Sequence, residues 1–160
     1  MEIKVATKDD LETINFLEKT CFLKTEAASY ESLRSRLEVY SEGYDILYVD
    51  NKAVGYIGGL KNDTLELNDD MYHDSSLHCP RGRYQTIFSV CILPEFQRRG
   101  YASMMVKHYV EQRKDQVDGF VLTCKDHLIP FYEKCGFSFE KVSKSTHGNV
   151  KWNDMILKLC

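Results

Sequence analysis

The chain has 160 residues and a formal charge of −3, from 24 acidic and 21 basic side chains. That length is typical of one domain, and ten tyrosines, eight phenylalanines and only three prolines exclude a disordered chain. The weak negative charge argues against a general nucleic-acid-binding protein, and no apolar run approaches the roughly 20 residues of a membrane span. We therefore expect one soluble, cytoplasmic domain over residues 1–160, a monomer or homodimer, whose partner is neither a nucleic acid nor a membrane.

The cysteines are spread along the chain without a Cys-x-x-Cys pair. Because nothing indicates secretion, no disulfide framework is expected. Cys91 and Cys124 lie inside apolar runs and are predicted to be buried, whereas the terminal Cys160 is expected to be an exposed thiol. Cys124 and His127 have a spacing that metal ligands use, but a second such pair is missing, so no metal site is predicted.

The first 60 residues predict a strand, two helices and a hairpin from the spacing of their apolar side chains. Thr7 and Ser29 are suited to begin the two helices, because their hydroxyls can accept hydrogen bonds from free backbone N–H groups. A tight turn is expected at residues 50–52. The predicted elements are, in chain order, a strand at 2–6, a helix from Thr7 to Cys21, a helix from Ser29, and strands at 45–49 and 53–60.

The rest of the chain begins with a long polar connection at residues 61–83, which a compact domain usually keeps for function or orders by itself. Gly136 is placed to end a short helix in the left-handed conformation. The predicted elements are a buried strand at 84–93, a helix from Gly100 to about residue 114, a strand at 119–124, a helix at 128–135, and strands at 137–142 and 152–159. This order predicts an α+β fold, with a mixed sheet and helices on both faces.

The sharpest feature of the sequence is the turn Phe-Gln-Arg-Arg-Gly-Tyr-Ala-Ser at residues 96–103, between the buried strand and the following helix. Gly100 and Ala102 are small enough for a ligand to approach the backbone, where the first N–H groups of the helix are free. Arg98 and Arg99 add positive charge at the rim. The turn therefore predicts an anion site that fits a pyrophosphate, with a solvated strand-to-helix turn as the alternative.

Two segments resemble motifs of the GNAT N-acetyltransferase family. The pattern Gln97-x-x-Gly100-x-Ala102, after the strand end at 90–94, resembles the acetyl-CoA motif of that family. Residues 128–137, with the sequence LIPFYEKCGF, resemble its second conserved segment. This resemblance implies one GNAT domain, a mostly antiparallel sheet of six to seven strands, and acetyl-CoA as the acetyl donor.

The resemblance also implies roles at the donor site. The family opens its central strand at a bulge, so that the backbone of Val90 and Ile92 would pair with the pantetheine arm and the Val90 N–H would polarise the thioester carbonyl. Thr123 would line the acetyl pocket, and Tyr132 would protonate the departing thiolate. The residues expected to bind acetyl-CoA are Val90, Cys91, Ile92, Gln97, Arg98, Arg99, Gly100, Tyr101, Ala102, Ser103, Thr123 and Tyr132.

Stretches at residues 25–29, 77–82 and 122–126 are similar to the arylalkylamine (serotonin) N-acetyltransferases. Those enzymes place two histidines on the central strand to relay the proton of the amine, and this chain has Thr86 and Phe88 there. Phe88 cannot carry a proton, so the sequence predicts no general base. We expect the acceptor to lie near three residues, Glu26, Thr86 and Phe88.

The predicted activity is transfer of an acetyl group from acetyl-CoA to a small primary amine, by direct attack within a ternary complex. His73, His78 and the carboxylates of residues 63–74 lie on or near the long loop, where they can act through water, steer a cationic amine or simply solvate the loop. Two alternatives stay open. One is an N-acetyltransferase of proteins or peptides, and the other is a CoA-binding sensor without turnover.

Overall fold

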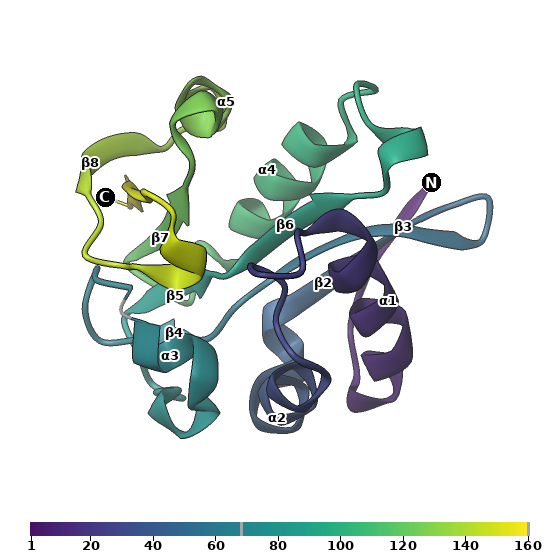
Figure 1. The fold of residues 1–160 in the computed structure, drawn as a ribbon, viewed down its shortest axis with the longest axis horizontal. Coiled ribbons are helices and arrows are strands. Elements are labelled where there is room, and N and C mark those ends of the chain that lie inside the picture. Colours follow the sequence, from purple (N-terminus) through teal and green to yellow (C-terminus); the bar gives the residue numbers. More distant parts are fainter. Residues whose placement is uncertain (68, 160) are drawn as a thin grey trace.

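The computed structural model describes residues 1–67 and 69–159, which form two β-sheets (Figure 1). Cys160 lies outside the described residues. The first sheet is antiparallel and has the order β1-β2-β3-β6, from β1 (Glu2–Val5), β2 (Tyr44–Val49), β3 (Lys52–Gly58) and β6 (Ser89–Ile92). The second has the order β4-β5-β7-β9-β8, from β4 (Lys61–Asn62), β5 (Tyr84–Ile87), β7 (Gly119–Cys124), β9 (Asn153–Lys158) and β8 (Ser138–Val142).

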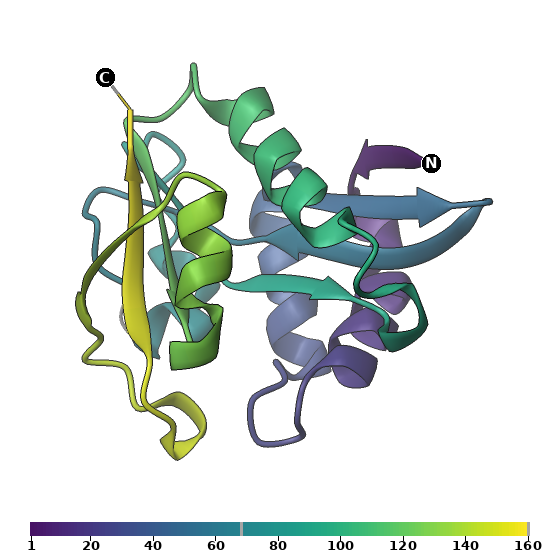
Figure 2. The same cartoon turned by 90° about the horizontal axis from the view of Figure 1, so that it is seen from above.

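Helices cover both faces of these sheets. They are α1 (Leu11–Cys21), α2 (Tyr30–Tyr40), α3 (Asp69–His73), α4 (Tyr101–Arg113) and α5 (Ile129–Lys134). Figures 1 and 2 show α4 and α5 on one side of the sheets and α1 and α2 on the other. None of the helices in the described part of the chain is long and apolar enough to cross a membrane. The predicted α+β class is confirmed.

The predicted helix starts and turns have clear local causes. The Thr7 hydroxyl accepts from the Asp9 N–H at 3.2 Å, and the chain then makes one 3-10 turn before α1 begins. The Ser29 hydroxyl accepts from the Ser32 N–H at 3.1 Å and begins α2. Asp50 and Asn51 both have positive φ, which a tight hairpin turn between β2 and β3 requires.

The predicted strand at 84–93 is divided in the structure. The Phe88 N–H donates to the Gly58 carbonyl at 2.8 Å, while Ser89 is also registered opposite Gly58. Two residues therefore face one, which is a β-bulge, and the strand changes direction there. Before the bulge β5 pairs with β7, the one parallel pairing among the described strands, and after it β6 pairs with β3. This division, together with the short β4, gives nine described strands in two sheets.

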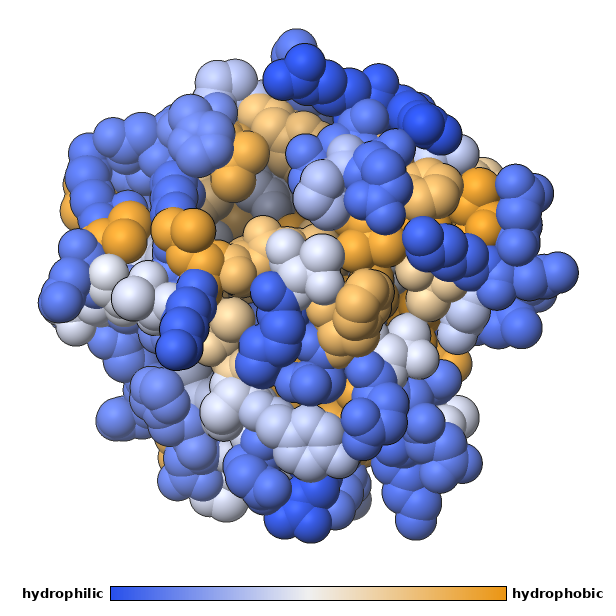
Figure 3. All heavy atoms as spheres, turned by 45° about the vertical axis from the view of Figure 1, so that its right-hand side comes forward, coloured by the Kyte–Doolittle hydropathy of each residue, from blue (hydrophilic) through white to orange (hydrophobic). Residues whose placement is uncertain are grey.

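The described part of the connection at 61–83 forms short elements that pack onto the second sheet. It contains β4, α3 and a 3-10 turn at Ser75–Leu77. Leu67 and Met71 are buried in a small apolar cluster, and the other buried members of that cluster are Leu60, Val121 and Ile156. The larger core lies between the first sheet and its helices. Figure 3 shows one face of the molecule, on which hydrophobic side chains form a band surrounded by hydrophilic ones.

Candidate active site

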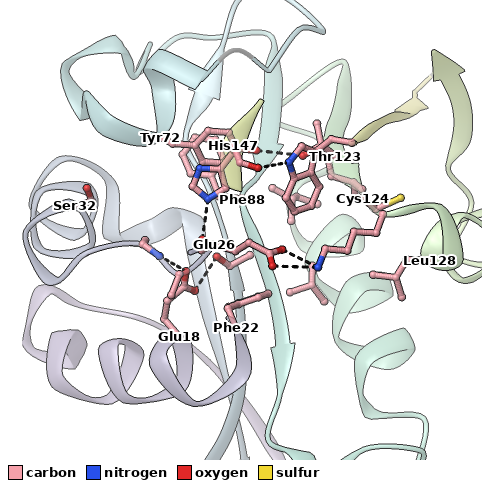
Figure 4. A pocket seen from close by; sticks show the side chains of 18 of the residues that line it. Glu18, Phe22, Glu26, Ser32, Tyr72, Phe88, Thr123, Cys124, Leu128 and His147 are labelled. Carbon is pink, nitrogen blue, oxygen red and sulfur yellow. Dashed lines mark hydrogen bonds and ion pairs between the residues drawn. The ribbon is translucent and has the colours of Figure 1, made fainter. Parts of the chain in front are cut away.

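A pocket of about 450 Å³ lies where the two sheets separate, next to the bulge at Phe88. Its walls come from the loop between α1 and α2, one face of α2, strands β6 and β7, α3, α5 and residues 147–152. Figure 4 shows side chains from these elements directed at one another across the pocket. The bulge creates this space, because it leads β6 away from β7.

The free edge of β6 borders the pocket. The Leu93 N–H donates to the Val54 carbonyl at 2.7 Å, so strand alternation directs the N–H of Cys91 toward β3 and those of Val90 and Ile92 toward the open edge. Val90 lines the pocket. The Cys91 side chain is buried in the core, so only its backbone can serve the site.

The first turn of α4 contains the residues where the sequence predicts an anion site. Arg98 and Gly100 have φ of 64° and 82°, and this left-handed backbone is tolerated best by glycine. No heavy atom lies within 4 Å of the place where a Cβ of Gly100 would stand, so the turn is open to a ligand. The first internal bond of the helix runs from the Met104 N–H to the Gly100 carbonyl at 3.1 Å, which leaves the N–H groups of residues 101–103 free. The turn therefore fits a phosphate-bearing ligand.

The side chains around this turn support its shape. Gln97 Nε2 donates to the Ile92 carbonyl at 3.0 Å and ties the turn to the end of β6. Arg99 Nη2 donates to the Glu95 carbonyl at 3.1 Å, and the guanidinium lies 5.3 Å from the centre of the Phe96 ring. Arg98 and Arg99 are both exposed, so their charges remain available to an anion.

Tyr132 of α5 is another residue in the wall of the pocket. It is 7% exposed, lines the pocket, and its hydroxyl makes no hydrogen bond with a described residue. Burial, followed by the nearby Cys124 thiol, raises the pKa of Tyr132 above its usual value. The hydroxyl therefore keeps its proton at neutral pH.

Three residues from distant parts of the chain meet beside Phe88. The hydroxyls of Tyr72 and Thr123 lie 3.2 Å apart, and the ring of His147 stacks on Tyr72 with centroids 5.3 Å apart (Figure 4). Nε2 of His147 lies 2.8 Å from the Glu26 carbonyl. Because a carbonyl only accepts, Nε2 carries a proton, and Nδ1 is the ring nitrogen that makes no hydrogen bond with a described residue.

Glu18 of α1 is a buried carboxylate in the same pocket, 3% exposed. Its Oε1 accepts from the hydroxyls of Tyr56 at 2.5 Å and Ser89 at 3.1 Å. Its Oε2 accepts from the Ala28 N–H at 2.8 Å. Since a carboxylate oxygen can accept two hydrogen bonds, Oε2 still has a site for one further donor.

Glu26 crosses the pocket and pairs with Lys125 at the end of β7. The two Nζ–Oε distances are 2.8 Å and 3.1 Å, and the Glu26 side chain is 6% exposed (Figure 4). Lys125 Nζ also lies 6.0 Å from the centre of the Trp152 ring. Together with the His147 bond to Glu26, this ion pair holds the loop between α1 and α2 against the second sheet.

Other candidate residues lie away from the pocket. Thr86 is fully buried, and its hydroxyl donates to the Leu60 carbonyl at 2.6 Å and accepts from the Leu60 N–H at 3.0 Å. His78 stacks on Tyr40, and its Nδ1 accepts from the Lys61 N–H at 3.1 Å. Neither side chain lines the pocket, whereas His73 does.

The carboxylates of the long loop are used locally. Glu66 forms an ion pair with Lys141 at 2.9 Å. Asp69 accepts from the Ser145 hydroxyl at 2.5 Å and the Thr146 N–H at 3.0 Å. No carboxylate of residues 63–67 or 69–74 lines the pocket, so the structure gives no support to steering of an amine by this loop. The described residues also contain no group of three or more His, Cys, Asp or Glu side chains suited to hold a metal ion.

Sequence reasoning missed several residues of the pocket, because each lies on an element that is distant in the chain. The sequence does contain a signal for Glu18 and Arg36, which is a charged residue on the apolar stripe of a helix. Glu18 follows Ile14 by four positions and Arg36 follows Leu33 by three, so each places a charge on the buried stripe of a helix. Tyr72 and His147 carried no comparable signal.

Comparison with known proteins identifies the family. Over 159 residues the chain is 26% identical to serotonin N-acetyltransferase of Mesocricetus auratus, covering 96% of this chain and 75% of that protein. The loading GNATL domain of CurA from Lyngbya majuscula has a TM-score of 0.87 at 17% identity, covering 98% of this chain and 96% of that one.

A second solved structure, the GphF GNAT-like decarboxylase in complex with isobutyryl-CoA, has a TM-score of 0.87 at 14% identity and covers both chains fully. At these identities the two structures show a shared fold. Residues 9–137 match the model of the acetyltransferase (GNAT) family, and the chain therefore belongs to that family.

Proposed function

We propose that residues 1–160 act as one acetyl-CoA-dependent N-acetyltransferase domain, whose acceptor is a small primary amine. One observation carries this proposal. The pocket joins the unpaired edge of β6 at Val90 to the free hydroxyl of Tyr132, so a polarising N–H and a proton donor face one space. An acyl transfer needs both groups, one at the carbonyl oxygen and one at the leaving sulfur.

The donor would bind along β6 and the start of α4. The free N–H groups of residues 101–103, with Arg98 and Arg99, would hold the pyrophosphate, and the edge of β6 at Val90 and Ile92 would hold the pantetheine arm. The open space at Gly100 supports this assignment. When bound, acetyl-CoA supplies an activated thioester.

The reaction forms an N–C bond and breaks the C–S bond. A neutral amine nitrogen loses one proton and the sulfur gains one, so these two transfers balance. An amine that arrives as an ammonium group first releases one further proton to solvent. We assign donation to the sulfur to Tyr132, whose raised pKa keeps it protonated. We propose that Nδ1 of His147 accepts the proton of the amine, directly or through one water, because Nε2 is already engaged with the backbone carbonyl of Glu26.

Glu18 would hold the amine before reaction. Its Oε2 has one free acceptor site, and a buried carboxylate attracts an ammonium group more strongly than an exposed one does. Ser89, one residue before Val90, links Glu18 directly to the strand edge. On this proposal the amine would lie next to the acyl carbon.

The closure of the pocket favours a small acceptor over a peptide. The Glu26–Lys125 pair and the His147 bond to Glu26 join both walls, and Trp152 Nε1 donates to the His147 carbonyl at 2.8 Å. A peptide acceptor would need these three contacts to open into a groove. A small amine fits within about 450 Å³ without that change.

The test is release of CoA thiol by the purified chain from acetyl-CoA, with a panel of polyamines, arylalkylamines, amino acids and short peptides. We expect turnover with at least one small primary amine. Turnover with peptides alone would contradict the proposed acceptor class. Slow hydrolysis that no amine accelerates would contradict catalysis of transfer and favour a CoA-binding sensor.

A further inference from the structure

Arg36 is a buried cation in the wall of the pocket. It lies on α2, is 3% exposed, and is one of the residues that line the pocket. Its Nη2 donates to the Tyr72 carbonyl at 2.7 Å, and its guanidinium lies 4.8 Å from the centre of the Phe88 ring. Nε is buried without a hydrogen-bond partner, and Nη1 donates to no described residue. The guanidinium lies beside the hydroxyl of Tyr44, which is polar but supplies no negative charge.

The second buried arginine shows how this chain pairs a guanidinium. Arg113 is 6% exposed, and its Nη1 and Nη2 donate to the two carboxylate oxygens of Asp45 at 3.1 Å and 2.8 Å. It also donates to the Glu42 carbonyl at 2.7 Å. None of the ion pairs among the described residues includes Arg36. Burying a guanidinium without its anion is costly, so the missing anion needs an explanation.

The two carboxylates that line the pocket, Glu18 and Glu26, form no ion pair with Arg36. Glu26 pairs with Lys125, which makes that part of the pocket neutral. Glu18 accepts three hydrogen bonds on the α1 side of the pocket and forms no ion pair with Arg36. The pocket therefore presents one unpaired anion, Glu18, and one unpaired cation, Arg36, on separate helices.

We propose that the substrate carries a carboxylate that binds to Arg36. A carboxylate matches the planar guanidinium, and the enclosed position would make the hydrogen bonds strong. On the proposed transferase function, on which this inference rests, the acceptor is then an amino acid, with its amine at Glu18 and its carboxylate at Arg36. The two unpaired charges of the pocket are complementary to such a zwitterion.

The same chemistry has a second source. A carboxylate at the far end of the acyl group, as in malonyl-CoA, would also bring an anion into the pocket. The test therefore has an acceptor arm and a donor arm. The acceptor arm compares amino acids with their primary amides and their decarboxylated amines, using acetyl-CoA. The donor arm compares malonyl-CoA with acetyl-CoA, using a neutral amine.

Both arms of the test are measured with two variants of Arg36 and one matched control variant. Arg36→Met keeps most of the side-chain length and removes the charge, which a buried site tolerates well. Arg36→Lys keeps the charge and removes the planar fork. Arg34 is on the same helix, is exposed and pairs with Glu31, so Arg34→Met is the control. Far-UV circular dichroism and thermal unfolding show whether each variant is folded.

We expect the carboxylate-bearing member of one arm to have a KM at least tenfold lower than its neutral analogues. Arg36→Met should abolish that preference, Arg36→Lys should restore it in part, and Arg34→Met should leave it unchanged. Binding of the same compounds to the CoA-loaded protein is measured by calorimetry, which does not need turnover. Arg36-dependent binding without transfer would support this inference and contradict the proposed function.

Equal KM and equal affinity for charged and neutral analogues in both arms would overturn the inference, even if neutral amines were acetylated. A carboxylate preference that survives in Arg36→Met would also overturn it, because the preference would then arise elsewhere.

Discussion

Removal of the Tyr132 hydroxyl is a small structural change that tests directly whether Tyr132 is the general acid. Tyr132→Phe keeps the ring between its neighbours Phe131 and Phe137, whose centroids lie 4.9 Å and 6.1 Å away. Loss of a general acid typically costs about 10²- to 10⁴-fold. We expect kcat to fall by at least about 100-fold, with less than a twofold change in affinity for acetyl-CoA measured by calorimetry.

Tyr48→Phe, on β2 and away from the pocket, is the control for this variant and should keep wild-type kcat. An unchanged kcat in Tyr132→Phe would remove Tyr132 from the mechanism.

Two buried tyrosines offer a matched test of how polar groups are paired. Tyr56 donates to Glu18 at 2.5 Å, whereas the hydroxyl of Tyr44 is buried without a partner. Tyr56→Phe should destabilise the fold by about 1–3 kcal/mol, because it takes a donor from a buried carboxylate. Tyr44→Phe should leave stability unchanged or raise it, since it removes an unpaired polar atom.

Urea denaturation at neutral pH measures both free energies of unfolding. Equal losses in the two variants would show that the Glu18 contact does not hold the carboxylate in place.

The turn into α4 can be tested as an element, because the chain contains a second left-handed glycine. Gly100 has φ of 82° and Gly136 has φ of 102°. Alanine at either position should cost about 1 kcal/mol of stability, from its strain at positive φ. Only Gly100→Ala should also weaken CoA binding, and Gly100→Glu should abolish it, because its carboxylate would enter the pyrophosphate site.

Calorimetric titration with CoA separates these outcomes. Full binding by Gly100→Glu would contradict the anion site, and weakened binding by Gly136→Ala would show that stability alone explains the loss.

The elements of the proposed donor site could be predicted from sequence, because their signals are local. Helix capping by Ser29, the small residue at Gly100 and the apolar stripe of α4 each depend on a few neighbouring residues. The family resemblance implied a bulge in the central strand, but the apolar pattern of the strand could not predict it or its position at Phe88, since it arises where one strand pairs with two different sheets. No pattern of alternation within residues 84–93 records which neighbour each half will have.

At the scale of the whole molecule, the residues on the proposed acceptor side of the pocket could not be predicted from the sequence, for the same reason. Glu18, Arg36, Tyr72 and His147 come from α1, α2, α3 and a loop near the end of the chain, so only the tertiary fold brings them together. The net charge of −3 also hid their arrangement. The net charge is a sum over all charged side chains, so it contains no information about the single buried charges that line the pocket.

The buried tyrosines predict how stability depends on pH. Burial raises the pKa of Tyr44 from 10.0 to about 12, and it raises the pKa of Tyr56 and Tyr109 well above 10.0. Above pH 10 the unfolded chain therefore releases protons that the folded chain retains. Stability is full below pH 10 and falls as pH rises, by about 1.4 kcal/mol per pH unit for each tyrosine.

Urea denaturation across this range, on wild type and Tyr44→Phe, measures the slope. The variant should lose stability less steeply, because one titrating group is gone. Identical slopes would mean that Tyr44 ionises in the folded protein as readily as in the unfolded chain.

We propose that this pocket transfers an acetyl group from acetyl-CoA to an amine. The most direct measurement follows an isotopically labelled acetyl group from acetyl-CoA by mass spectrometry, with amino acids and neutral amines as acceptors. We expect the label on the amine nitrogen in an amount equal to the thiol released, and we expect both to disappear together in Tyr132→Phe. Recovery of the label only as free acetate, at a rate that no acceptor changes, would contradict the claim.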